Sequence, residues 1–311
     1  MKLKKPNFWD YKKPHFFAYL LLPLSYLVMI YNFLTSKKKN KIDNIKTICI
    51  GNIYVGGTGK TPLSIETIKI LNNLNYKACF VKKKYSDQID EQKLLKSKGK
   101  LFCEKDRMDA TNKAINENFN VAIFDDGLQD KKIKYDISIV CFNEKVEIGN
   151  GLLLPSGPLR ENIKSLKKYD AVFLNGNNSN KSNFEKKIKE EFSHLKIFKS
   201  TYSITNLQEL DNSERYLVFA GIGNFDNFTD MLKKNNFRVV NAILYPDHYN
   251  YSNSDIKKIK DMAKFNEAKI ITTEKDYLRI RDENKKGIDV AKIKLDIKNN
   301  DEFVDFLNKK L

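Results

Sequence analysis

One stretch near the start of the chain, residues 47–63, constrains the fold more than any other. Residues 47–50 form a short apolar run that predicts a buried strand, a glycine-rich loop follows it, and Pro62 opens a helical pattern. A strand, a glycine-rich loop and a helix N-terminus together form a cradle in which backbone amides and the helix dipole face a phosphate. These features predict a P-loop that binds ATP. The expected nucleotide-binding residues are Tyr54, Val55, Gly56, Gly57, Thr58, Gly59, Lys60 and Thr61.

Two side chains at the end of this loop suit phosphoryl chemistry. Lys60 would place a positive charge on the phosphates, and the Thr61 hydroxyl would bind a Mg²⁺ ion that bridges them. The loop departs from the full P-loop pattern at one position, because Tyr54 stands where a first glycine is expected. The alternative interpretation is a glycine-rich turn between a strand and a helix that holds no ligand.

Residues 121–129 form the second informative stretch. An apolar run ends in Asp125 and Asp126, and Gly127 follows. A strand that ends in aspartate beside a P-loop is the Walker B arrangement, in which the carboxylate organises Mg²⁺. An Asp-Gly turn at a strand end is the structural alternative. Next to a P-loop, the pattern favours Asp125 and Asp126 as metal ligands.

The first 46 residues differ in composition from the rest of the chain. Residues 16–34 carry no charge and would extend about 28 Å as one helix, which is marginal for spanning a bilayer, and Pro23 interrupts them. Lysines flank the segment on both sides, whereas a full span would favour them on the cytoplasmic side only. A buried core helix is the alternative. We expect a peripheral or monotopic membrane anchor, on the cytoplasmic face of the inner membrane.

The net charge of +17 is compatible with an anionic partner such as a phosphate, an acidic membrane surface or a nucleic acid. Lysine, asparagine and isoleucine are abundant along the whole chain, so this charge also fits a general bias in composition. The charge therefore permits an anionic partner without choosing among these classes.

The pattern of the remaining chain predicts an α/β protein. We expect two α/β/α units, a P-loop NTPase-like domain and a smaller Rossmann-like domain, preceded by the hydrophobic anchor helix. The polar run at 175–182 is a loop or boundary, and strands are expected at 216–220, 239–244 and 269–273, with Ser254 as a helix cap. The predicted division is 1–40 for the anchor, 41–208 for the kinase domain and 209–311 for the C-terminal domain.

His248 follows a predicted strand, which is where an α/β sheet places its ligands. From spacing alone a structural histidine remains the alternative to a catalytic one.

Several blocks of the sequence together resemble the tetraacyldisaccharide 4'-kinase family, which phosphorylates a lipid A precursor. The blocks occur in family order and cover most of the chain. They are residues 51–62 around the glycine loop, 125–129 (DDGLQ), 149–161 (GNGLLLPSGPLRE), Asp247-His248 and 272–276 (TTEKD). The family loop is similar to the present one in lacking the first glycine of the P-loop pattern.

The resemblance implies transfer of the ATP γ-phosphoryl group to the 4'-hydroxyl of a tetraacyldisaccharide 1-phosphate, a lipid disaccharide. It implies Asp90 and His248 as the pair that activates the hydroxyl, with Lys60 as the third catalytic residue. It implies further residues near the phosphates, the substrate or the metal, which are Arg107, Gln129, Arg160 and Glu161, with Glu161 as a metal ligand. The implied cofactors are ATP and Mg²⁺, the partners are the lipid and the inner-membrane surface, and no nucleic acid is expected.

The chain departs from the family pattern around Asp90. The family segment Ser-Arg-Gly-Tyr-Gly corresponds here to residues 82–86 (KKKYS), and Ile89 and Gln92 replace the glycine and proline that flank the acidic pair. Asp130 stands where a histidine is common. The polar loop over 82–91 is nevertheless well placed to meet an anionic substrate.

The alternative function is that of a membrane- or DNA-associated partitioning ATPase, whose loop also contains Gly-Gly-x-Gly-Lys-Thr. That class carries a lysine immediately before the two glycines, where this chain has Val55. A non-enzymatic membrane adaptor would need neither Lys60 nor the aspartate pair.

Overall fold

The computed structural model describes residues 5–35, 39–85, 88–176 and 183–311. The predicted loops at 82–91 and 175–182 and the lysines that flank residues 16–34 lie partly outside these ranges. The chain forms two compact units, which are described separately. Unit 1 comprises Met1–Lys84, Gly99–Thr201 and Ile297–Leu311, and unit 2 comprises Tyr85–Lys98 and Tyr202–Asp296. The predicted domain division at residues 40 and 208 stays a prediction.

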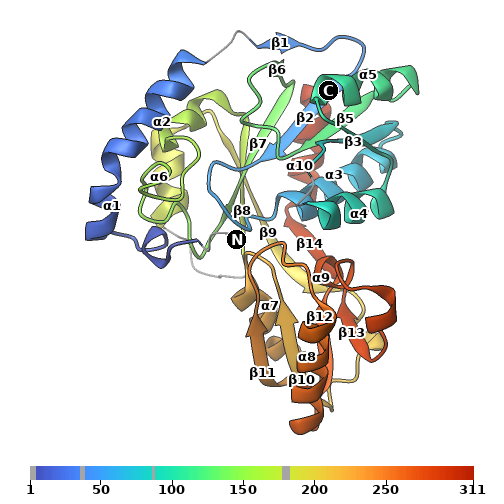
Figure 1. The fold of residues 1–311 in the computed structure, drawn as a ribbon. Coiled ribbons are helices and arrows are strands. Elements are labelled where there is room, and N and C mark those ends of the chain that lie inside the picture. Colours follow the sequence, from blue (N-terminus) through green and yellow to red (C-terminus); the bar gives the residue numbers. More distant parts are fainter. Residues whose placement is uncertain (1–4, 36–38, 86–87, 177–182) are drawn as a thin grey trace. The chain divides into compact units, whose positions relative to one another are not determined.

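Unit 1 is built on a sheet with the strand order β14-β9-β8-β7-β2-β5-β3-β4 (Figure 1). All the registered pairs from β9 to β4 are parallel. The strands are β2 (Lys46–Gly51), β3 (Ala78–Lys83), β4 (Leu101–Glu104), β5 (Val121–Asp125), β7 (Ile137–Asn143), β8 (Ala171–Asn175), β9 (Lys196–Ile204) and β14 (Ile293–Lys298). A small parallel pair, β1 (Asn40–Lys41) and β6 (Ile133–Lys134), accompanies this sheet. The boundary between the two units falls inside β9 and β14.

Helices cover both faces of this sheet, so the central strands β5, β7 and β8 are buried throughout. Val172 and Leu174 share one core with residues of α5 and α6, whereas Phe173 points the other way and lies 5.0 Å from Phe303 of α10, ring centroid to centroid. The unit therefore has three layers. Its helices after the N-terminal segment are α3 (Lys60–Asn73), α5 (Arg107–Asn116), η2 (Ile163–Lys168), α6 (Asn183–Glu191) and α10 (Asn300–Lys310).

The strand β2 lies at the centre of the sheet, between β5 and β7. The chain builds outward from β2 toward β3 and β4 and later toward β7, β8 and β9 on the other side. The carboxyl end of β2 therefore lies at a topological switch point, the place where open α/β sheets bind their ligands.

The N-terminal segment forms two short helices where one was expected. They are α1 (Phe16–Leu20) and α2 (Leu22–Leu34), and a short helical turn, η1 (Asn7–Trp9), precedes them. Pro23 lies in the first turn of α2, where a missing amide hydrogen bond costs nothing, so it starts a second helix. Among the described residues, no helix is long and apolar enough to cross a membrane. The membrane anchor stays a prediction.

Unit 2 has its own parallel sheet with the strand order β11-β10-β12-β13 (Figure 1). Apolar side chains of α7 pack on one face, and those of α8 pack on the other. The strands are β10 (Arg215–Ala220), β11 (Arg238–Leu244), β12 (Lys269–Thr273) and β13 (Ile288–Ala291). The helices are α4 (Ile89–Lys98), α7 (Phe225–Lys234), α8 (Asn253–Phe265), α9 (Glu274–Tyr277) and the turns η3 (Leu207–Glu209) and η4 (Asp282–Asn284).

The start of α8 differs from the prediction by two residues. Ser252, and not Ser254, is the N-cap, because its side chain accepts the backbone N–H of Asp255 while the Asp255 carboxylate accepts that of Ser252. The prediction of an α/β chain built on parallel sheets is confirmed.

Candidate active site

The predicted P-loop connects β2 to α3, and α3 begins at Lys60. Gly59 has a φ of +87° and Gly56 a φ of +139°, values that only glycine adopts without strain. Asn52 braces the loop, since its Nδ2 donates to Thr58 Oγ1 at 3.0 Å and to the Gly56 carbonyl at 3.3 Å. The strand, loop and helix thus have the arrangement that a phosphate cradle requires.

Tyr54, at the position where the P-loop pattern has glycine, is buried, with 1% of its surface exposed. Its hydroxyl donates to the Asp10 carboxylate and accepts from Lys5 Nζ at 2.7 Å. Burial, and then the hydrogen bond to Asp10 and its charge, raise the pKa of Tyr54 well above its ordinary value. The tyrosine is therefore a neutral, fully packed part of the loop.

Asp125 ends β5 and lies beside the P-loop, because Ile50 of β2 is its partner in the parallel register. The Thr61 hydroxyl is 3.3 Å from Asp125 Oδ2, so the threonine and the first aspartate predicted to bind Mg²⁺ meet. Lys82 Nζ lies 2.7 Å from the same oxygen, and both side chains are buried, Lys82 with 1% and Asp125 with 0% exposed. Lys82 was not predicted as a site residue, although its position directly after an apolar run could have pointed to it.

Asp126 adopts a positive φ of 59°, which turns it out of the strand. Arg160 Nη1 lies 2.9 Å from Asp126 Oδ1, and Lys60 Nζ is 4.0 Å from Oδ2. Burial would raise the pKa of Asp126, but the charges of Lys60, Arg160 and Lys82 outweigh it and lower that pKa below its ordinary value. Asp126 is thus held as a carboxylate between two cations that the sequence predicted near the phosphates.

The remaining predicted residues of unit 1 join this group. Gln129 links Arg160 to Glu161, because its Oε1 accepts from Arg160 at 3.2 Å and its Nε2 donates to Glu161 at 2.9 Å. Arg107 Nη2 donates to the Asp126 carbonyl at 2.6 Å. The structure therefore brings the cations, the aspartate pair, Gln129 and Glu161 into one network around the P-loop. Glu161 joins this network through its hydrogen bond with Gln129.

Asp90 and His248, which are 158 residues apart in the sequence, meet in unit 2. His248 Nδ1 lies 3.1 Å from Asp90 Oδ1, and Asp90 is buried, with 4% exposed. Asp90 lies in the first turn of α4, and His248 follows β11 with a φ of +56°. This pair is separate from the P-loop network, which belongs to unit 1.

Two cations that were not predicted as site residues also hold Asp90. Arg279 Nη2 lies 2.6 Å and Lys275 Nζ 3.7 Å from Asp90 Oδ2. Burial raises the pKa of Asp90, but the His248 hydrogen bond and the charges of Lys275 and Arg279 outweigh it and hold that pKa well below its usual range. Asp90 is therefore held as a carboxylate at neutral pH.

Asp276 in turn fixes Arg279. The Arg279 Nη1 donates to Asp276 Oδ1 at 2.9 Å, and the buried Asp276 also accepts from the Gly221 amide and from the Tyr251 hydroxyl. Burial would lower the pKa of Arg279, but the charges of Asp276 and Asp90 raise it. Arg279 lies one helical turn beyond the TTEKD block, and this spacing could have pointed to it.

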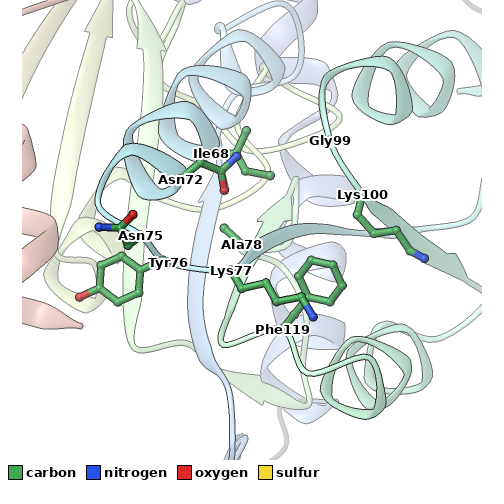
Figure 2. Close-up of a pocket in the computed structure, with 9 residues that line it drawn as sticks. All are labelled: Ile68, Asn72, Asn75, Tyr76, Lys77, Ala78, Gly99, Lys100 and Phe119. Atoms are coloured by element: carbon green, nitrogen blue, oxygen red, sulfur yellow. The ribbon is translucent and has the colours of Figure 1, made fainter.

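The structure also has a surface hollow of about 460 Å³ in unit 1, shown in Figure 2. It is lined among others by Asn75, Lys77 and Lys100, which precede β3 and β4, and by Phe119, which precedes β5. The hollow is therefore at the amino edge of the parallel sheet, opposite the P-loop. None of the predicted site residues lines it.

The chemistry of the P-loop network fits a Mg²⁺ ion. The Thr61 hydroxyl, the Asp125 and Asp126 carboxylates and Glu161 are oxygen donors of the kind that Mg²⁺ prefers. Over the described part of the chain, no cluster of three or more His, Cys, Asp or Glu side chains is arranged to hold a metal alone. A metal here would complete its coordination with phosphate and water oxygens, as Mg²⁺ in nucleotide sites does.

Comparison with known proteins gives one consistent result. A protein of Pelagibacter ubique (strain HTCC1062) named tetraacyldisaccharide 4'-kinase is 54% identical over 297 residues, which cover 96% of this chain and 95% of that protein. A protein of the same name from Rickettsia canadensis (strain McKiel) is 34% identical and covers 91% of this chain and 90% of its own length.

The fold is also that of a solved structure. The crystal structure of "apo" form LpxK from Aquifex aeolicus in complex with ATP is similar with a TM-score of 0.69 at 22% identity, over 94% of this chain and 99% of that chain. The profile of the family described as tetraacyldisaccharide-1-P 4'-kinase matches residues 17–311. The chain belongs to the tetraacyldisaccharide-1-P 4'-kinase family.

Proposed function

We propose that this chain is a lipid kinase that transfers the γ-phosphoryl group of ATP to the 4'-hydroxyl of a tetraacyldisaccharide 1-phosphate. The observation that carries the proposal is the buried pair of Asp90 and His248, joined at 3.1 Å from distant parts of the sequence. An alcohol acceptor needs a group that takes its proton, and this pair supplies a carboxylate for that role in addition to the aspartates of the P-loop network. The 54% identity to a protein named for this activity supports the same acceptor.

In this proposal, the P-loop network holds the nucleotide. Residues 54–61 surround the phosphates, Lys60 neutralises them, and Arg107, Gln129 and Arg160 bind phosphate or substrate oxygens. Thr61, Asp125, Asp126 and Glu161 would hold Mg²⁺, which would neutralise charge at the phosphates. The two aspartates have different partners. Asp125 faces Thr61, whereas Asp126 faces the cations Lys60 and Arg160.

In the transfer step, the 4'-oxygen bonds to the γ-phosphorus, the bond from that phosphorus to the bridging oxygen breaks, and ADP leaves. The hydroxyl proton goes to Asp90, and His248 orients the carboxylate. A carboxylate with a lowered pKa is a weak base, but the transition state of phosphoryl transfer is loose and needs the proton accepted late. The low pKa therefore keeps the acceptor ionised at little cost to the reaction.

The N-terminal segment would bring the enzyme to its lipid. The helices α1 and α2 carry a run of exposed apolar side chains, among which Phe33 is 78% exposed. An exposed apolar patch of this extent is typical of a surface that lies in a membrane interface. We therefore propose a peripheral or monotopic protein of the inner membrane, on the cytoplasmic face because the P-loop needs cytoplasmic ATP.

The test is an incubation of the purified full chain with γ-labelled ATP, Mg²⁺ and the lipid disaccharide. We expect label on the 4'-oxygen of the lipid, and no transfer when the 4'-hydroxyl is absent. Hydrolysis that DNA or plain vesicles stimulate, without label on the lipid, would instead support the partitioning ATPase and contradict the kinase.

A further inference from the structure

Tyr54 is a buried side chain of the nucleotide loop. Its ring packs on the loop itself, because a Cβ added to Gly56 would lie 3.3 Å from the ring edge. A buried tyrosine needs a partner for its hydroxyl, since an unpaired polar group in the interior is costly. The identity of that partner therefore decides what holds this part of the loop.

The partners come from the N-terminal segment. Lys5 Nζ donates to the Tyr54 hydroxyl at 2.7 Å, the hydroxyl donates to the Asp10 carboxylate, and Lys5 and Asp10 form an ion pair at 2.6 Å. The ammonium of Lys5 also lies 5.0 Å from the centroid of the Tyr54 ring. These three side chains form a closed triangle, which we call the Tyr54 triad.

A second connection joins the N-terminal segment to the loop 149–161. Trp9 Nε1 donates to the Pro155 carbonyl at 3.0 Å, and the Asn150 amide donates to the Trp9 carbonyl at 2.9 Å. The contact is close, because a Cβ on Gly149 would lie 2.2 Å from the Trp9 carbonyl oxygen. Only glycine at that position allows the two backbones to approach in this way.

A third connection comes from α2. The buried Ser25 donates to the Leu153 carbonyl at 2.9 Å, and its Oγ accepts the backbone N–H of Ser156 at 3.1 Å. Ser25 is thus a buried polar side chain by which a helix with exposed apolar residues docks on the loop 149–161.

The loop 149–161 in turn pairs with the nucleotide loop. The Val55 amide donates to the Pro158 carbonyl at 2.8 Å, and the Arg160 amide donates to the Ile53 carbonyl at 2.7 Å. Tyr54 and Leu159 form an isolated antiparallel bridge between these two bonds. The side chain of Arg160 then reaches Asp126. The N-terminal segment, the loop 149–161 and the nucleotide loop are therefore one hydrogen-bonded block.

We propose that Lys5 and Asp10 are positioning residues of the nucleotide site, which act through Tyr54 to hold the P-loop in the conformation that binds ATP. The segment proposed to meet the bilayer is then also a structural part of the ATP site. This inference rests on the proposed function for the identity of the nucleotide. It differs from a membrane-targeting role, which would affect the lipid substrate and leave ATP binding unchanged.

The test compares two variants of the triad with a matched control. Tyr54→Phe removes only the hydroxyl, Asp10→Asn removes the charge that holds it, and Tyr19→Phe removes a hydroxyl from an exposed tyrosine of the same segment. The full-length proteins are titrated with ATP and Mg²⁺ in detergent, without the lipid, and the dissociation constant is measured by calorimetry. In parallel, KM for ATP and kcat are measured with the lipid present.

We expect Tyr54→Phe and Asp10→Asn to weaken ATP binding and raise KM for ATP by about threefold to tenfold, as the loss of one or two hydrogen bonds predicts. The kcat at saturating ATP and the KM for lipid should stay within about twofold, because the reacting groups are untouched. Tyr19→Phe should match the wild type. A merely structural role would lower stability and active fraction, and hence kcat, without moving KM for ATP.

Trp9 gives a second readout that does not depend on activity. It is the single tryptophan of the chain and lies at the junction of the N-terminal segment and the loop 149–161. We expect ATP to change the tryptophan emission of the wild type and of Tyr19→Phe, and to change it less in Tyr54→Phe.

Unchanged ATP affinity in both triad variants would overturn the inference, and so would a fall in kcat with KM for ATP unaltered. Wild-type protein that binds ATP with these shifts but does not phosphorylate the lipid would overturn the proposed function alone. Wild-type protein that does not bind ATP at all would overturn both.

Discussion

The P-loop network of unit 1 differs from the Asp90 cluster of unit 2 in how the chain assembles it. The Asp90 cluster consists of Asp90, His248, Lys275 and Arg279. In unit 1 the centre of the site is a continuous stretch, residues 52–61, whose conformation comes from glycines and a helix start. In unit 2 the site consists of single side chains from α4, from the turn after β11, from α9 and from the turn that follows α9. The first is a backbone site for phosphate, and the second is a side-chain site that fixes one carboxylate.

The two tasks of a kinase, which are to bind the nucleotide phosphates and to accept the proton of the acceptor, thus fall to sites of different construction. Backbone amides are suited to binding an anion whose shape does not change, whereas a proton acceptor must be one carboxylate with a fixed charge state. We therefore expect changes in the P-loop network to affect ATP binding and catalysis together, and changes in the Asp90 cluster to affect catalysis alone.

The largest effect is expected from Asp90→Asn, which removes the proton acceptor and keeps the shape of the side chain. We expect kcat to fall by about 10²- to 10⁴-fold, the range for loss of a general base. Steady-state assays with the lipid acceptor measure this. A rate close to that of the wild type would move the base to another residue, with Asp126 the first alternative.

Lys60→Ala is expected to have the next largest effect, because it removes the positive charge of the P-loop. We expect a loss of about 10²- to 10³-fold in kcat/KM for ATP, as for the loss of one donor to a developing charge. Unlike Asp90→Asn, this variant should also bind ATP more weakly. Normal ATP affinity in Lys60→Ala would contradict the assignment of unit 1 as the nucleotide site.

The buried pair of Lys82 and Asp125 predicts a loss of stability. Lys82→Met leaves the Asp125 carboxylate buried without its cation, and breaking a buried ion pair costs about 3–5 kcal/mol. Urea unfolding of the full chain measures this, with the exposed-pair variant Lys186→Met as the control, which should cost less than about 1 kcal/mol. Ser64 Oγ also donates to Asp125 Oδ1 at 3.4 Å. Equal midpoints for the two variants would show that the hydroxyls of Thr61 and Ser64 suffice to hold Asp125.

Arg279→Gln is expected to have the smallest effect on rate and a distinct effect on pH dependence. The cation helps to lower the pKa of Asp90, so Asp90 stays ionised until the pH falls toward that lowered value. Without Arg279 the pKa of Asp90 rises, and the acidic limb of the kcat/KM profile should move to higher pH. We expect a loss of about tenfold at neutral pH, less than the 10²- to 10⁴-fold range for loss of an acid–base group, because Asp90 itself is kept.

Arg279→Lys is the control, because it keeps the charge and loses the fork geometry. It should restore the acidic limb, although not the full rate. The same limb in Arg279→Gln and in the wild type would show that His248 and Lys275 alone set the charge of Asp90.

The sequence predicted most of what depends on neighbouring residues. The strand expected at 269–273 has those bounds, and the strand expected at 47–50 is one residue longer at each end, 46–51. These predictions succeed because apolar runs between turns define buried strands. The helix cap was placed on Ser254, yet Ser252 has the acidic residue three positions on that a capping box requires. That error could have been avoided from the sequence.

The parts that could not be predicted depend on contacts between distant residues. Nothing near Tyr54 in the sequence shows that Lys5 and Asp10 pair with its hydroxyl, and Arg279 reaches Asp90 across 189 residues. The resemblance to a family identified Asp90 and His248, but it does not say which cations hold them. Such side-chain networks follow from the packing of the sheet and not from local patterns.

The most direct test of this division is the ATP affinity of Asp90→Asn, measured together with its rate of phosphoryl transfer to the lipid. The account predicts an ATP dissociation constant within about twofold of the wild type and a transfer rate reduced at least about a hundredfold. A variant that loses ATP binding, or that binds ATP normally and still phosphorylates the lipid at the wild-type rate, would contradict it.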